Sequence, residues 1–377
     1  MGVKSKEVCT GLNKIKAILE LDDKTVLVSD SNKHQICMLT KTSSGVWDMR
    51  TVAGKDGERG DRDGAAAEAR FCYPDGLTLL PDGRVLVGDY GNHRIRMLSA
   101  DLQDVSTVAA KDGEYGYRDG AAAYARFNYP TSLALLPGDR VLPGDRVLVA
   151  DWANHCIRML SADLQQVSTV TGAGVPGHQD GAAAQAVFCL PSGLALLPDD
   201  GRVLVADNNG IRVLSADLQD VSTLTIDGVG GATAFELLTD GRVLVANNYH
   251  IRVLSADLKD VSTFTIDGVN YPTAFGRLSD GHVLVADKSS VRIFDPRDIG
   301  VNMKEVQDIT NMNTTSTKGS QGGNLAILPV AVLDGLVTPL LAGEVEQKRI
   351  EQQEEQKKAE EAAGGTAAAD GTSQLKF

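Results

Sequence analysis

The sequence predicts an all-β fold: a six-bladed β-propeller of four-stranded antiparallel blades, with a short helical or disordered C-terminal tail. Three observations lead to this prediction. One motif recurs six times, each copy contains four short β-rich runs, and glycine is abundant, with 39 in 377 residues. Antiparallel units that repeat about every 40 residues are typical of propeller blades, which bury both faces by packing radially around an axis.

The recurring motif consists of an apolar run, an Asp-Gly turn, a second apolar run that ends in aspartate, a short loop, and a run that opens Ile-Arg. Asp-Gly tolerates the positive φ angles of a tight hairpin. Continuously apolar runs such as Val-Leu-Val-Ala predict strands buried on both faces. The isoleucine position of the six copies is occupied by Ile36, Ile95, Ile157, Ile211, Ile251 and Val291.

The best preserved copies are Val-Leu-Val-Gly-Asp-Tyr-Gly-Asn-His-Arg-Ile-Arg (85–96) and Val-Leu-Val-Ala-Asp-Trp-Ala-Asn-His-Cys-Ile-Arg (147–158). A Phe-x-x-Pro-x-Gly-Leu opening occurs at 71–77 and 188–194. These segments resemble the NHL-repeat family, and the resemblance extends over roughly residues 13–295. It implies a propeller that serves as an interaction platform, and it implies no single chemistry.

The first three copies are each followed by an insertion that contains Asp-Gly-Ala-Ala-Ala-x-Ala and ends at a phenylalanine. We expect the aspartate to cap one or two helical turns formed by the alanines, and the phenylalanine to pin the segment to the blade. The insertions span roughly 54–73, 110–129 and 172–190, with aspartates Asp63, Asp119 and Asp180 and phenylalanines Phe71, Phe127 and Phe188.

Connections between blades emerge on the same face as the loops between second and third strands, so the insertions should decorate one face over blades one to three. We expect a protein partner to dock there, and deletion of 111–126 to weaken binding while leaving the fold intact. The partner-binding candidates on this face are Arg59, Arg62, Arg70, Tyr90, Tyr115, Tyr117, Arg118, Arg126, Trp152 and His178.

Aspartates and histidines recur at fixed places in the loops. The aspartates follow a buried strand and are expected to accept backbone N–H bonds or to pair with the repeated arginines. The histidines belong to different blades, so they are expected to be turn residues rather than ligands of one zinc ion. These structural residues are Asp30, Asp89, Asp151, Asp207, Asp287, His34, His93 and His155.

An enzyme is the first alternative, because the sequence also loosely resembles six-bladed gluconolactonase-like hydrolases, which hold a divalent cation on the axis. A hard cation such as Ca²⁺ needs several oxygen ligands at one point. Here the inner strands offer Asp75, with Glu20 and Glu236 further along, as weak metal candidates. No catalytic group or cofactor-binding motif is legible, so we expect a scaffold without a cofactor.

An RNA-binding propeller is the second alternative, since arginines gather in the insertions. Acidic residues accompany them, which cancels the field. The net charge of −13 also disfavours nucleic acid and anionic membrane. Five scattered cysteines and a start without an apolar segment indicate a reducing, cytoplasmic location. We expect a monomer with a protein partner.

The ends of the chain are expected to differ from the propeller, which we assign to residues 1–310. Residues 311–323 are a predicted linker, 324–342 an apolar segment docked on the propeller, and 343–377 a charged helix and disordered tail. The last blade lacks a fourth strand. Either 304–310 or 7–11 could supply it and remove an exposed sheet edge.

Overall fold

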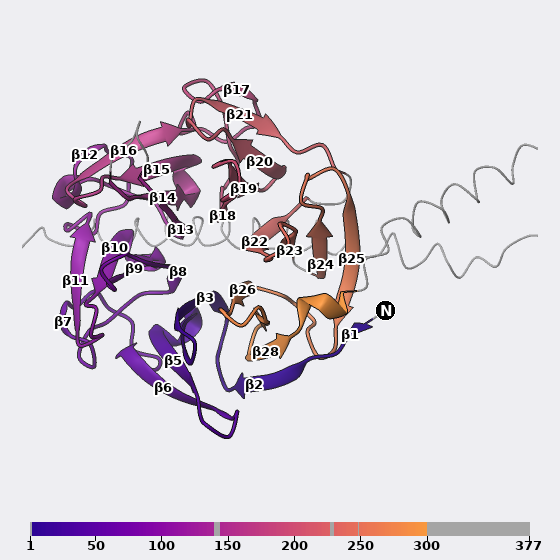
Figure 1. Ribbon diagram of the computed structural model, residues 1–377. Coiled ribbons are helices and arrows are strands. Elements are labelled where there is room, and N and C mark those ends of the chain that lie inside the picture. The colour runs from indigo at the N-terminus through magenta and orange to yellow at the C-terminus, as the bar shows by residue number, and fades with distance from the viewer. Residues whose placement is uncertain (1, 139–143, 227–229, 248, 300–377) are drawn as a thin grey trace, which may run out of the picture. The chain divides into compact units, whose positions relative to one another are not determined.

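The computed structural model describes residues 2–138, 144–226, 230–247 and 249–299, which form a ring of six antiparallel sheets around a central axis (Figure 1). The predicted six-bladed β-propeller is therefore confirmed. The predicted linker, apolar segment and charged tail lie outside the described residues, as does the strand candidate at 304–310.

In blades 1 to 5 the four blade strands run outward from the axis in chain order. Blade 1 contains β3 (Ile15–Asp22), β4 (Thr25–Asp30), β5 (Gln35–Lys41) and β6 (Trp47–Gly54). Blade 2 contains β8 (Pro74–Leu79), β9 (Val85–Asp89), β10 (Arg94–Leu98) and β11 (Asp104–Ala109). Blade 3 contains β13 (Pro130–Leu136), β14 (Arg146–Asp151), β15 (Cys156–Leu160) and β16 (Gln166–Thr171).

The second half of the ring repeats this plan with shorter loops. Blade 4 contains β18 (Gly193–Leu196), β19 (Val203–Asp207), β20 (Gly210–Leu214) and β21 (Asp220–Thr223). Blade 5 contains β22 (Ala232–Leu237), β23 (Val243–Asn247), β24 (His250–Leu254) and β25 (Val261–Ile266). Blade 6 contains β26 (Ala274–Arg277), β27 (Val283–Ala286) and β28 (Ser290–Phe294), with its outer strand supplied from elsewhere.

The hydrophobic core is divided among the blade junctions. Among the described residues, six apolar clusters each combine side chains of two neighbouring blades, the last joining blade 6 to blade 1. The Val-Leu-Val runs of the second strands are fully buried because each blade face packs on the next blade. Burial of apolar surface, at about 25 cal/mol per Å², thus favours a closed ring over an open stack.

The insertions take a form that the sequence analysis did not predict. Strap 1 (54–73), strap 2 (110–129) and strap 3 (172–190) each place a two-residue strand antiparallel to the outer edge of the following blade. Those strands are β7 (Gly64–Ala65), β12 (Gly120–Ala121) and β17 (Gly181–Ala182). Of the predicted one or two helical turns, each strap forms one, in which the N–H of Ala69, Ala125 or Ala186 donates to the carbonyl four residues earlier. The turn of strap 2 contains the 3₁₀ helix η3 (Ala122–Tyr124), and the aspartates bond the outer strands instead of capping these turns.

The reason is local. The glycines after the three aspartates have φ between +115° and +119°, which breaks a helix, and their backbone pairs instead with the outer strands. The straps also belong to blades two to four rather than one to three. The three anchoring phenylalanines are fully buried, as expected.

The N-terminal segment closes the ring. Its strand β2 (Lys6–Thr10) is the outer strand of blade 6 and pairs antiparallel with β28. The preceding strand β1 (Gly2–Val3) pairs parallel with β25 of blade 5 (Figure 1). Of the two candidates for the missing strand, the structure uses the N-terminal one, so blade 6 combines both ends of the propeller.

Short 3₁₀ turns decorate the face that carries the loops between second and third strands, which we call the loop face. They are η1 (Ser31–Lys33), η2 (Tyr90–Asn92) and η4 (Trp152–Asn154), in blades 1, 2 and 3. A further turn, η5 (Pro296–Asp298), follows blade 6. Blades 4 to 6 have shorter loops at the same position, so the loop face is built up on one side of the ring.

Candidate functional site

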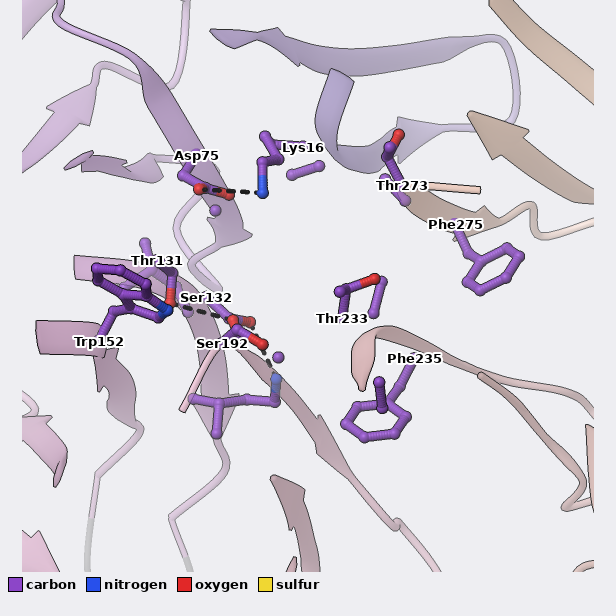
Figure 2. A pocket seen from close by; sticks show the side chains of 18 of the residues that line it. Lys16, Asp75, Thr131, Ser132, Trp152, Ser192, Thr233, Phe235, Thr273 and Phe275 are labelled. Atoms are coloured by element: carbon purple, nitrogen blue, oxygen red, sulfur yellow. Dashed lines mark hydrogen bonds and ion pairs between the residues drawn. The ribbon is translucent and has the colours of Figure 1, made fainter. Parts of the chain in front are cut away.

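A cavity of about 400 Å³ lies on the axis, lined by the innermost strands of all six blades (Figure 2). Neighbouring inner strands are joined by hydroxyl groups here: Thr131 Oγ1 donates to the Ser192 carbonyl at 3.1 Å, and the Leu194 N–H donates to Ser132 Oγ at 3.1 Å. The wall is therefore polar and mostly uncharged. Its hydroxyls are those of Thr131, Ser132, Ser192, Thr233 and Thr273.

The one carboxylate that the sequence places at the start of an inner strand, Asp75, is paired with a lysine. Lys16 Nζ lies 3.8 Å from Asp75 Oδ2. Figure 2 shows the two side chains pointing toward each other. Burial raises the pKa of Asp75, and the nearby Lys16 and Lys14 oppose that shift. Asp75 therefore already has cationic partners where a metal ion would have to bind.

The two other metal candidates are engaged with blade 6. Glu236 accepts the Arg277 N–H at 3.2 Å, and burial raises the pKa of Glu236 to about 7. Glu20 accepts the N–H of Ser279 at 2.8 Å. Among the described residues no group of three histidine, cysteine, aspartate or glutamate side chains is placed to hold a metal ion.

Aromatic side chains of blades 2 and 3 lie beside the axial cavity on the loop face. Tyr73, Tyr90 and Trp152 line a second cavity of about 420 Å³, which shares Lys16, Asp75 and Trp152 with the first. Ring centroids are 4.6 Å apart between Tyr90 and Tyr129, and 6.0 Å apart between Tyr129 and Trp152. We call Tyr73, Tyr90, Tyr129 and Trp152 the aromatic mouth.

The loop aspartates position these rings. Asp151 is buried and accepts the Asn128 N–H at 2.7 Å, while the Trp152 N–H donates to the Tyr129 carbonyl at 3.3 Å. Asp89 likewise accepts a hydrogen bond from the Cys72 N–H at 2.8 Å. Asp89 and Asp151 thus tie the 3₁₀ turn of their own blade to the end of the incoming strap.

Histidines fix the tyrosines from the preceding blade. Nδ1 of His34 accepts the Tyr73 N–H, and Nδ1 of His93 accepts the Tyr129 N–H, both at 3.1 Å. His155 makes the same bond to Leu190. Burial lowers the pKa of all three histidines, which keeps the imidazoles neutral and able to accept.

The tyrosines themselves have an unusual backbone. Tyr73 and Tyr129 have φ of +52° and +61°, and each precedes a proline. Lys14 and Leu190, at the same position in blades 1 and 4, have φ of +64° and +54°, so this left-handed conformation belongs to the repeat. It costs on the order of 1–3 kcal/mol for a residue with a side chain. The histidine bonds and the ring packing hold both tyrosines in this strained conformation at the mouth.

Two of the repeated arginines are buried and pair with the loop aspartates of their blades. Arg96 and Arg158 are fully buried, and each bonds the loop aspartate of its blade, at 2.9 Å for Asp89 and 2.8 Å for Asp151. Burial raises the pKa of both carboxyls to about 6. The remaining loop aspartates accept bonds from side chains or backbone nearby: Asp30 from Asn13 and Gln35, Asp207 from Cys189 and Asn209, and Asp287 from Ser289 and Ser290.

The structure brings only part of the predicted partner-binding set together. Tyr90 and Trp152 belong to the aromatic mouth. The exposed Tyr115 packs on His93 beside the mouth, with the two ring centroids 5.7 Å apart. Tyr117 and His178 lie on the outer straps, where they contact Thr169 and Thr223.

The predicted arginines are mostly paired within the straps. Arg62 contacts Glu68, Arg70 contacts Glu58, Arg118 contacts Asp112, and Arg126 contacts Glu114. Arg59 lies near His34 and Cys72, where its charge acts on both. The straps therefore present mixed charge rather than a basic field.

Sequence reasoning missed Tyr73, Tyr129, Lys14 and Lys16. The tyrosines occupy the same place in two Phe-x-Tyr-Pro segments, and that alignment was the available signal. Lys14 and Lys16 of blade 1 occupy the positions of Tyr73 and Asp75 in blade 2, because Ile15 pairs with Asp30 as Pro74 pairs with Asp89. Burial and the neighbouring Lys16 lower the pKa of Lys14, so the mouth holds two cations close together.

Comparison with known proteins identifies the repeats. The NHL repeat family model matches residues 71–97 and 188–214. Protein SUPPRESSOR OF QUENCHING 1, chloroplastic, of Arabidopsis thaliana is 26% identical over 217 residues, which are 54% of this chain and 20% of that protein. NHL repeat-containing protein 2 of Gallus gallus is 31% identical over 108 residues, 28% of this chain and 14% of that protein. The chain thus spans a fifth or less of these relatives.

Solved structures share the fold at low sequence identity. A putative gluconolactonase superposes with a TM-score of 0.56 at 12% identity, over 78% of this chain and 92% of that one. A gluconolactonase of Xanthomonas campestris superposes with a TM-score of 0.56 at 12% identity, over 77% of this chain and 89% of that one. Streptogramin B lyase superposes with a TM-score of 0.51 at 14% identity, over 77% of this chain and 96% of that one. Among the described residues, no helix is both long and apolar enough to cross a membrane.

Proposed function

Because the chain belongs to the NHL-repeat β-propeller family, we propose that it is a protein-binding scaffold that recognises its partner through the aromatic mouth on the loop face. The observation that carries the proposal is the cluster of partly exposed rings around an open cavity. Tyrosine and tryptophan are enriched at the energetic centres of protein interfaces. The hydrolases that share the fold support the architecture only.

The chemistry of the mouth indicates which part of a partner it takes. Lys14 and Lys16 face a cavity in which Asp75 is the nearby carboxylate, so one further anionic group would be favoured there. The rings supply apolar and stacking contacts around it. We therefore propose that a protruding loop or chain end with an aromatic or aliphatic residue next to a carboxylate enters the mouth.

Hydrolysis and RNA binding, the two alternatives, draw no support from the described residues. Asp75 has lysine partners, Glu236 and Glu20 bond blade 6, and the strap arginines are paired with acids. We propose no cofactor and no catalytic residue, and a monomeric chain. For the compartment we propose the cytoplasm, because all five cysteines are free thiols. Microscopy of a tagged chain tests this against the chloroplast named for the Arabidopsis relative.

Truncation of the mouth tests the proposal. Proteins captured by the full chain are quantified and compared with those captured by Trp152→Ala and by Tyr90→Ala. We expect each variant to lose the specific partner, since a central interface residue contributes about 2 kcal/mol, roughly 30-fold in affinity. Tyr124→Ala is the matched control, because Tyr124 is 71% exposed on strap 2, outside the mouth.

Thermal unfolding of each variant confirms that the fold is kept. Capture in EDTA should give the same result as capture in Ca²⁺, because no metal is required. Undiminished capture by both mouth variants would contradict the proposed site. A partner that binds only in Ca²⁺ would contradict the metal-free mechanism.

A further inference from the structure

The three straps repeat one way of binding a carboxylate. In strap 1, Asp63 Oδ1 accepts from Arg96 Nε at 2.9 Å and Nη2 at 2.6 Å, and from Thr107 Oγ1 at 3.0 Å. Its Oδ2 accepts the Thr107 N–H at 2.9 Å. A guanidinium, a hydroxyl and a backbone N–H thus surround one carboxylate at the outer edge of blade 2.

The same arrangement recurs in blades 3 and 4. Asp119 is held by Arg158 Nη2 at 2.6 Å and by the Thr169 N–H at 3.0 Å. Asp180 is held by Arg212 Nη2 at 2.7 Å and by the Thr223 N–H at 3.0 Å. The chemistry of this receptor is therefore defined three times within one chain.

Each carboxylate comes with a short strand. The glycine and the alanine that follow the aspartate pair antiparallel with the first residues of the outer strand, as Gly64 with Val105 and Ala65 with Asp104. Glycine suits this edge because its φ is between +115° and +119° in the three straps, a backbone conformation that residues with a side chain rarely adopt. Asp-Gly-Ala is thus one recognition unit that combines a charge with strand pairing.

Blade 5 has the receptor without the unit. Arg252 and Thr263 are register partners on β24 and β25, as Arg96 and Thr107 are on β10 and β11. Directly before blade 5 the sequence has Asp227-Gly228-Val229 in place of Asp-Gly-Ala, and these three residues lie outside the described part of the chain. Arg252 makes no hydrogen bond or ion pair with any described residue, and its Nε is buried without a partner.

Two comparisons show that this state is particular to Arg252. Arg212 also has an unpartnered Nε, yet its terminal nitrogens bond Val187, Gln179 and Asp180. Arg292 of blade 6 bonds Ser5 and Glu7 of the closing segment. Arg252 is the cation at this position that lacks such partners in the described part of the chain.

The strand edge beside Arg252 is also open. The N-terminal β1 pairs with β25 only at Thr265 and Ile266. Among the described residues, nothing pairs with the outer edge of 261–263, and Thr263 is exposed. Within the described ranges, the place that a strap strand occupies on blades 2 to 4 is therefore unoccupied on blade 5.

We propose that the outer edge of blade 5 binds an acidic segment of a partner protein, in which an aspartate is followed by two small residues. The partner's carboxylate takes the place of Asp63 between Arg252 and Thr263, and its next two residues add a short antiparallel strand to β25. Charge complementarity and the three internal copies specify this occupant. The site is separate from the aromatic mouth and does not depend on it.

The test uses the strap sequence itself as the probe. A labelled peptide with the sequence of residues 61–69 is titrated into the full chain and followed by fluorescence anisotropy. We expect saturable binding, weakened roughly tenfold or more by Arg252→Gln, because a hydrogen-bonded charge is lost. The same peptide with Asp63→Asn should bind as weakly. Arg202→Gln in the protein, at a partly exposed arginine that pairs with Asp200, should change nothing.

Thr263→Val provides a second variant, and thermal unfolding verifies that each variant folds. Binding that is absent, or unchanged by Arg252→Gln and Thr263→Val, overturns the proposal. So does binding that appears only after Asp227→Asn, since the receptor would then be satisfied from within the chain. Saturable binding of inorganic phosphate without binding of the peptide would show that the site takes a free anion instead. Dimerisation that depends on Arg252, measured by sedimentation, would show that the occupant is a second copy of the chain.

Discussion

At the scale of single residues, buried arginines hold the straps to the ring. Arg96 bonds Asp63 and Asp89 and the carbonyls of Arg62 and Arg70, and its guanidinium lies 5.1 Å above the Phe71 ring. Planar, multiply bonded guanidinium cannot be replaced by lysine in such a site. The fully buried Asp89 depends on it for its counter-charge.

We predict that Arg96→Ala lowers the free energy of unfolding by about 3–5 kcal/mol, because it leaves the Asp89 carboxylate buried without its partner. Urea unfolding measures the change. The control is Arg84→Ala, whose partly exposed pair with Asp82 should contribute less than about 1 kcal/mol. Equal effects of the two substitutions would show that the buried pair is not the anchor we describe.

The histidines predict a pH dependence. His93 accepts the Tyr129 N–H through a neutral Nδ1, and burial lowers its pKa from 6.5. As the pH falls, the His93 imidazole therefore becomes protonated in the unfolded chain before it does in the folded one. The stability that His93 contributes is complete above pH 6.5 and is lost as the pH falls below that value.

His93→Asn isolates this contribution. Asparagine tolerates the φ of +55° at this position and offers an acceptor oxygen that does not titrate in this range. Between pH 7 and pH 5 we expect the wild-type chain to become less stable relative to His93→Asn, measured by urea unfolding at each pH. The comparison cancels the opposite effect of Asp89 and Asp151, whose pKa values are raised. Parallel stability curves for the two proteins would exclude a titrating histidine.

At the scale of elements, ring closure depends on the first ten residues. Strand β2 covers the edge of β28, and Val3 joins the apolar cluster between blades 5 and 6. We predict that deletion of residues 1–10 lowers the thermal unfolding midpoint and causes self-association, because β28 becomes an open edge.

Deletion of residues 1–4 alone is the matched control. It removes β1 but keeps β2, so we expect a smaller loss of stability and a monomer by light scattering. If the longer deletion left both the midpoint and the mass unchanged, the N-terminal strand would not be what closes the ring.

The blades could be predicted from the sequence more fully than the straps. Six copies of one motif determined the blades, and the buried phenylalanines were foreseen from their position. The strap conformation was not, because Asp-Gly-Ala-Ala-Ala favours a helix locally, whereas the partner arginine and threonine that pull it into a strand lie more than 30 residues away in sequence. For the same reason residues 111–126 are part of blade 3: Asp119 bonds Arg158, so deleting them would remove a structural contact along with any binding surface.

At the scale of the whole propeller, the elaborated loops of blades 1 to 3 and the straps on blades 2 to 4 lie on one side of the ring. The sequence indicated this asymmetry, yet it pointed to the strap arginines as the contact residues. Most of those arginines form ion pairs within the straps. Packing between blades 2 and 3 instead brings Tyr73, Tyr90, Tyr129 and Trp152 together beside the axial cavity. Contacts of that kind are set by ring geometry, which spacing along the chain does not reveal.

Site-specific photo-crosslinking tests the recognition of a partner at the aromatic mouth most directly. A benzoylphenylalanine is placed at Tyr90 or Tyr129, and at Asp163 in the turn between the third and fourth strands of blade 3, where Asp163 accepts bonds from Ser161 and Gln165. We predict that irradiation yields one and the same protein adduct from the two mouth positions and none from position 163. Adducts formed at position 163 but not at the mouth would contradict the account.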